Sequence, residues 1–203
     1  MGLFIVFICG LIAIDFGLIL LAKKFIKTDK QIRILFLIYP ILTILCHYSS
    51  LVYHAFTPEY PPIEFIKNNP NLVLPIYPCN LIMWLLLLLG IFWNKRENRF
   101  FRIVKDFCFY FGVISAMVGM FVNTDFIQNP TLKDFDITKG IVAHAFMLMN
   151  MFALPFYKEV KVDLFSNFIH ITIGIICLGI IGLYNSLLIT VFSSKENAEF
   201  INS

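Results

Sequence analysis

The sequence predicts an all-α fold, a polytopic membrane protein built as a bundle of six transmembrane helices with both termini outside. Two features of the composition support this fold class: 59% of the 203 residues are hydrophobic, and only 14% are charged. These proportions exclude an ordinary water-soluble globular domain, a disordered chain and a small disulfide-rich secreted domain. The net charge of +3 is small and scattered, so no nucleic-acid partner is expected.

Six apolar segments match the length of a helix that crosses a hydrocarbon core about 30 Å thick, which takes roughly 20 residues. They lie near residues 3–22, 32–53, 72–93, 103–122, 137–156 and 168–191. Their apolar residues run continuously and do not alternate with polar ones, as they would in the strands of a membrane barrel. The connections are too short to hold a soluble domain, so residues 1–203 are expected to form one membrane domain.

The first segment, 3–22, is expected to remain in the protein as a span. It has no basic region before it, unlike a signal peptide. Lys23 and Lys24 follow it where a signal peptide would carry a small-residue cleavage site.

The distribution of basic residues predicts the orientation, because Lys and Arg near the ends of a span resist translocation. Twelve Lys and Arg residues belong to the first, third and fifth connections: Lys23, Lys24, Lys27, Lys30, Arg33, Lys95, Arg96, Arg99, Arg102, Lys105, Lys158 and Lys161. Four belong to the other side: Lys67, Lys133, Lys139 and Lys195. We therefore expect a multi-pass protein of the cell membrane, with both termini and the connections 57–71 and 123–136 outside.

Four polar residues lie on one face of the second predicted helix. Thr43, His47, Ser50 and His54 are spaced by four, three and four residues, which places them in one stripe at 3.6 residues per turn. Polar groups in a membrane turn towards the bundle interior or a wet cavity. Such a stripe can simply join helices by hydrogen bonds, the better interpretation for Thr43 and Ser50. The two histidines favour a functional role.

The third segment contains the motif Tyr77-Pro78-Cys79-Asn80. Proline suits the first position of a helix, so Cys79 is predicted to lie in the first turn. Backbone N–H groups without a helical acceptor and the positive end of the helix dipole favour a thiolate there and could hold an oxyanion. The alternative is a small apolar residue near a helix end, which is as plausible from this residue alone.

The fifth segment places His144 on the same helix face as Met147 and Met151. Methionines in such a stripe are more often flexible core residues than a substrate surface. Counting a helical rise of about 1.5 Å per residue, however, puts His47, Cys79 and His144 all roughly 10 Å below the outer membrane boundary. Three reactive groups from three helices in one layer favour chemistry over packing.

Small residues on two segments predict close helix contacts. Gly112, Ala116 and Gly119 share a face of the fourth segment, and Gly174 and Gly182 lie on the sixth.

Two further polar residues leave several roles open. Asn123, at the outer end of the fourth segment, could bind a lipid headgroup or cap the helix. Asp15, deep in the first segment, could be neutral, pair with a neighbouring helix or mark an ion path.

The short motifs Tyr77-Pro78-Cys79-Asn80 and His144-Ala145-Phe146, in a six-helix chain, resemble the YwaF-like family of bacterial integral membrane proteins. Its eukaryotic relative is transmembrane protein 164, in which the matching cysteine is implicated as the nucleophile of a phospholipid acyltransferase. The resemblance implies that Cys79 is the nucleophile and His144 its base.

The residue chemistry fits such a reaction. A Cys79 thiolate formed with help from His144 or His47 would attack the ester of a membrane phospholipid, give a thioester and release a lysophospholipid. Substrate contacts are expected from His54, Asn80, Ser50, Asn123 and Met147. The reaction needs no metal and no cofactor, and the sequence predicts no protein partner.

Two other functions fit the same residues. One is a binding or transport protein with a His-lined polar cavity for a small solute and no covalent chemistry, for which Cys79 is unnecessary. The other is a structural subunit whose small-residue faces pack against partner helices. We rank acyl transfer first, binding or transport second and the structural role third.

Overall fold

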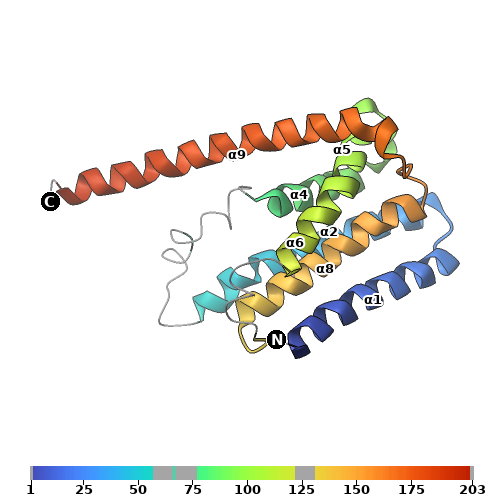
Figure 1. Ribbon diagram of the computed structural model, residues 1–203, viewed down its shortest axis with the longest axis horizontal. Helices are drawn as coiled ribbons and strands as arrows, with labels where there is room; N and C mark the ends of the chain where they lie inside the picture. Colours follow the sequence, from blue (N-terminus) through green and yellow to red (C-terminus); the bar gives the residue numbers. More distant parts are fainter. Residues whose placement is uncertain (1, 57–65, 67–76, 122–130, 202–203) are drawn as a thin grey trace.

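A computed structural model describes residues 2–56, 66, 77–121 and 131–201. All the secondary structure in these ranges is helical (Figure 1). Five helical segments within them are long and apolar enough to cross a membrane. The chain therefore has the predicted fold class, a polytopic helical membrane protein.

The helices follow the predicted segments in order. They are α1 (Gly2–Phe25), α2 (Asp29–Ala55), α4 (Pro78–Ile91), α5 (Arg99–Phe107), α6 (Val113–Phe121), α8 (Phe135–Phe156) and α9 (Leu164–Ile201). A 3₁₀ turn, η2 (Trp93–Lys95), follows α4, and a π-helical turn, η3 (Cys108–Gly112), joins α5 to α6. α5, η3 and α6 form one continuous span from Arg99 to Phe121.

Several helices extend beyond the apolar segments because polar caps define their ends. α2 begins at Asp29 because Thr28 forms a capping box: its hydroxyl accepts from the Gln31 N–H, and the Gln31 side chain accepts from the Thr28 N–H. α8 begins at Phe135 because the Asp134 carboxylate caps it. α4 is shorter than the predicted 72–93 segment in the described residues, since it begins only at Pro78.

α8 is the central helix of the bundle. It packs against α1, α2 and α6, and half of its residues are buried. A Cβ added at Gly112 would clash with the Met151 sulfur, and one added at Gly119 would clash with the His144 ring. The predicted close contact of this small-residue face is therefore confirmed.

α9 lies partly outside the bundle, unlike the other helices (Figure 1). It packs mainly against α5 and then extends past the bundle (Figure 1). Gly174 lies so close to Phe107 that a Cβ there would clash, as predicted. A Cβ at Gly182 would meet nothing within 4 Å, so the predicted close contact at Gly182 is wrong, because α9 has left the bundle at that point.

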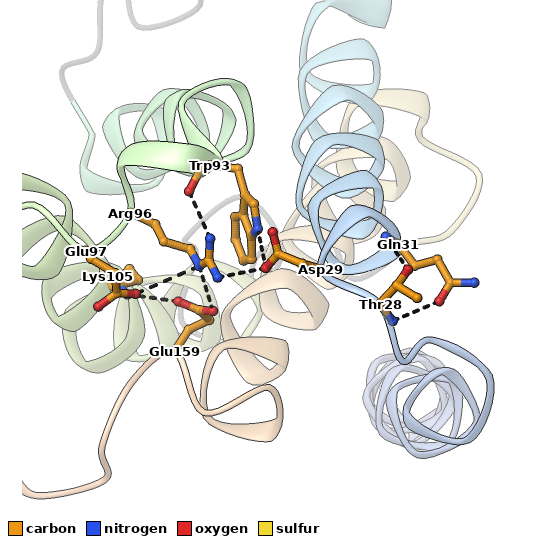
Figure 2. A network of polar contacts seen from close by, with 8 residues as sticks. All are labelled: Thr28, Asp29, Gln31, Trp93, Arg96, Glu97, Lys105 and Glu159. Atoms are coloured by element: carbon orange, nitrogen blue, oxygen red, sulfur yellow. Dashed lines mark hydrogen bonds and ion pairs between the residues drawn. The ribbon is translucent and has the colours of Figure 1, made fainter.

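A network of charged side chains joins the first, third and fifth connections on one side of the bundle (Figure 2). Arg96 donates to Asp29 at 2.7 Å and to Glu159 at 3.1 Å, and Lys105 donates to Glu159 at 2.9 Å. The indole N–H of Trp93 donates to Asp29 at 3.1 Å. The three basic connections therefore meet on one side, as the predicted alternation of spans requires.

Candidate active site

The first turn of α4 contains Cys79. Tyr77 is the N-cap in an extended conformation (φ −85°, ψ 146°), and Pro78 is the first helical residue, where its missing N–H costs no helical bond. Cys79 is half-buried, and its thiol donates to the side-chain oxygen of Asn80 at 3.5 Å. Asn80 is itself buried. The predicted position of Cys79 is confirmed.

The backbone donors of this turn are fewer than the sequence suggests. The N–H groups of Asn80 and Leu81 both donate to the Tyr77 carbonyl, at 3.1 and 3.4 Å. The first of these is a 3₁₀-type bond that occupies a donor otherwise left over at a helix start. Because Pro78 has no N–H, Cys79 is the other first-turn residue that offers a backbone N–H to an oxyanion.

The polar stripe of α2 turns into the bundle, as predicted. Thr43 and Ser50 are buried, and His47 and His54 are half-buried. The Thr43 hydroxyl donates to the Tyr39 carbonyl at 2.9 Å, a bond within its own helix. Thr43 therefore contributes a polar oxygen to the interior, and its hydroxyl donates within α2 and to no other helix among the described residues.

His144 is held by its own helix and by a glycine on α6. Its Nδ1 lies 2.7 Å from the Gly140 carbonyl oxygen, which can only accept, so Nδ1 carries the proton and Nε2 has the lone pair in the neutral ring. A Cβ at Gly119 would lie 2.5 Å from Nε2. The hydrogen at Gly119 therefore leaves space for the basic nitrogen.

A small cavity brings these groups together. Its volume is about 30 Å³, which is room for about one or two water molecules. It is lined by Thr43, His47, Cys79, Asn80, Met83, Ala143, His144 and Met147. The structure thus brings together five residues that the sequence singled out for catalysis or substrate contact, from α2, α4 and α8. Thr43 of the predicted α2 stripe, Met83 and Ala143 complete the lining.

Ser50 and His54 belong to a second polar cluster, outside the cavity lining that the described residues form. The Ser50 hydroxyl donates to Asp136 Oδ1, and His54 Nε2 lies 2.9 Å from Asp136 Oδ2. Lys139 Nζ lies 3.7 Å from Asp136 Oδ1 and donates to the His47 carbonyl oxygen at 3.3 Å. The cluster therefore joins α2 to α8 and reaches the backbone of a cavity residue.

The sequence analysis missed Asp136 and Lys139. A usable signal was present, because an acid and a base three residues apart at the start of a predicted span can pair on one helix face. Asp136 immediately precedes the fifth apolar segment and Lys139 lies just inside it, where a charge is costly without partners.

The remaining candidates lie elsewhere. Asn123 lies outside the described residues. Asp15 is buried in α1, and its Oδ2 atom has no hydrogen-bond partner among the described residues. No group of three or more His, Cys, Asp or Glu residues in the described ranges could hold a metal ion.

In comparisons with known proteins, no family model, curated protein or solved structure matches the chain.

Proposed function

We propose that this protein is an integral lipid acyltransferase of the cell membrane, with Cys79 as nucleophile and a phospholipid and a lysophospholipid as substrate and product. The cavity carries the proposal, because its lining joins a cysteine in a helix first turn to two histidines from other helices. The motifs around Cys79 and His144 support the same assignment through their resemblance to the YwaF-like family.

In the first half-reaction His144 is the base. Its Nε2 accepts the thiol proton while Sγ attacks the ester carbonyl carbon of a phospholipid. The Cys79 N–H faces the developing oxyanion. The ester C–O bond then breaks, the proton passes from His144 to the departing lysophospholipid oxygen, and the acyl group remains on Cys79 as a thioester.

In the second half-reaction His144 again acts first as a base and then as an acid. His144 takes a proton from the hydroxyl of an acceptor lipid, whose oxygen attacks the thioester carbonyl. The C–S bond breaks, and the thiolate regains its proton from His144. His47 lines the same cavity and is the second candidate base.

We place the parts of the substrate according to the size of the cavity. A volume of about 30 Å³ accommodates the reacting carbonyl and not a lipid. The acyl chain therefore lies between helices in the bilayer, and the headgroup meets the polar cluster of Ser50, His54, Asp136 and Lys139.

Intact-mass spectrometry of the purified protein after incubation with mixed phospholipids tests the proposal. We expect an acyl adduct that hydroxylamine removes, that is absent from Cys79→Ala and that persists in Cys46→Ala. Cys46 is a matched control, because it is also half-buried and lies beside His47 but does not line the cavity. His144→Gln should lower the rate of adduct formation more than His47→Gln.

Two other results would contradict the proposal. An equal adduct in wild type and Cys79→Ala would disprove the thioester. A wild-type protein that forms no adduct, while a small alkylating reagent still modifies Cys79, would favour solute binding, in which His47→Ala abolishes binding and Cys79→Ala does not.

A further inference from the structure

A long groove separates α1 from α2 in the half of the membrane nearest the basic connections. Both helices pack against α8 rather than closely against each other. The resulting groove has a volume of about 470 Å³, within the range of about 300–1,000 Å³ typical of small-molecule sites. Its lining comprises Leu18, Leu21, Ala22, Phe25, Ile26, Gln31, Ile34, Leu35, Ile38, Tyr39 and Leu42.

The lining is apolar along the groove and polar at its end. Leu18, Leu21, Ile34 and Ile38 line it and are exposed in the isolated chain, so in a membrane they face hydrocarbon. Gln31 lies at the end, where the connection between α1 and α2 closes the groove. An occupant therefore needs a long apolar part and one polar end.

Four lysines lie next to the polar end in the sequence. Lys23, Lys24, Lys27 and Lys30 are exposed and flank the lining residues in the sequence. The ammonium of Lys24 lies 5.8 Å from the ring centroid of Phe25, which lines the groove. Among the described residues, these lysines have no carboxylate within ion-pair distance, although Lys27 donates to the Lys23 carbonyl. The end of the groove therefore carries uncompensated positive charge.

Other basic residues on the same side of the membrane are already engaged. Arg96 is bonded to Asp29 and Glu159, and Lys105 to Glu159. Arg33 donates to the carbonyl oxygens of Gly90 and Ile91 at the end of α4. Asp29, the acid nearest the groove lysines in sequence, is thus neutralised by Arg96 and not by them.

We propose that this groove binds an anionic phospholipid, with one acyl chain between α1 and α2 and the phosphate at Lys24 and Lys27. The apolar lining selects the chain, and the uncompensated ammonium groups select the negative headgroup. The site is independent of acyl transfer, because its lining shares no residue with the Cys79 cavity.

Native mass spectrometry of the detergent-purified full chain, with equal amounts of phosphatidylglycerol and phosphatidylcholine, tests the proposal. We expect wild type to retain phosphatidylglycerol preferentially. Lys24→Gln combined with Lys27→Gln should weaken phosphatidylglycerol binding by about fivefold per lysine and leave phosphatidylcholine binding unchanged. Lys95→Gln combined with Lys161→Gln removes the same charge from exposed sites in the other connections and should have no such effect.

A second variant tests the groove itself. Ala22→Trp fills it without changing the charge and should reduce the binding of both lipids. Equal retention of the two lipids by wild type would overturn the proposal. So would an equal loss of phosphatidylglycerol in both lysine double variants, since that would assign the preference to overall charge.

Discussion

The two sides of the bundle arrange their polar groups differently. On the side of the basic connections, hydrogen bonds and ion pairs join Arg96, Asp29, Lys105 and Glu159, so each of these charges has a partner of opposite sign. On the other side, Cys79 and the histidines surround a cavity. Satisfied ionic groups hold a structure in one arrangement, whereas reactive groups around a free volume can meet a substrate. We therefore assign stability to the first region and chemistry to the second.

The largest expected effect comes from breaking the ionic network. Glu159→Gln removes the anion between Arg96 and Lys105, whose side chain is 3% exposed. We expect a loss of about 3–5 kcal/mol in the free energy of unfolding, because a buried cation is left without its close partner. The combined fluorescence of Trp84 and Trp93 in a titration with a denaturing detergent measures it.

Glu97→Gln is the matched control for this change. Glu97 also lies within ion-pair distance of Lys105, at 3.6 Å, but its side chain is 76% exposed. Its removal should change stability by less than about 1 kcal/mol. Equal losses in the two variants would contradict the structural role assigned to the buried network.

A smaller effect is expected at the cavity. Gly119→Ala places a Cβ 2.5 Å from His144 Nε2, so the ring has to move. We expect a loss of about 1–3 kcal/mol in unfolding free energy, as for overpacked cores, and a slower formation of the acyl adduct on Cys79. Thermal unfolding and intact-mass spectrometry measure the two effects.

Gly182→Ala provides the comparison on α9. A Cβ there meets nothing within 4 Å, so stability should stay the same or rise slightly with the helix propensity of alanine. A Gly119→Ala protein as stable and as reactive as Gly182→Ala would show that His144 is not held in place by α6.

The smallest expected effect is a gain. Tyr77 caps α4 without a side-chain hydrogen bond, so Tyr77→Ser should stabilise the protein by about 0.5–1 kcal/mol by adding an N-cap acceptor. Tyr77→Phe adds no acceptor and should give no gain. Thermal unfolding of the two variants distinguishes them, and an equal change in both would assign the effect to loss of the tyrosine hydroxyl.

Local patterns predicted much of this arrangement. Apolar length located the spans, helical spacing identified the inward face with Thr43 and His47, and the proline rule located Cys79 in a first turn. Each of these inferences depends on residues within about one helix. The depth estimate for His47, Cys79 and His144 agrees with their position around one cavity.

Long-range pairing was beyond the reach of such patterns. Arg96 and Glu159 are 63 residues apart and Ser50 and Asp136 are 86 apart, and no local rule selects one partner among several charges. The open surroundings of Gly182 depend on the direction of α9, which its sequence does not specify. The 3₁₀-type bond that occupies the Asn80 N–H is likewise a detail of backbone geometry.

The ionic network also constrains the order in which the spans assemble during synthesis. Glu159 follows Lys105 by 54 residues, so the ribosome delivers it on the order of several seconds later, at about 5–20 residues per second. Until then, of the carboxylates that the structure describes, Lys105 has only that of exposed Glu97 within ion-pair distance, and the buried ion pair that holds α5 against its neighbours is incomplete. The buried ion pair between Lys105 and Glu159 therefore forms only after the fifth span has been synthesised. The order of synthesis thus sets the order in which these spans assemble.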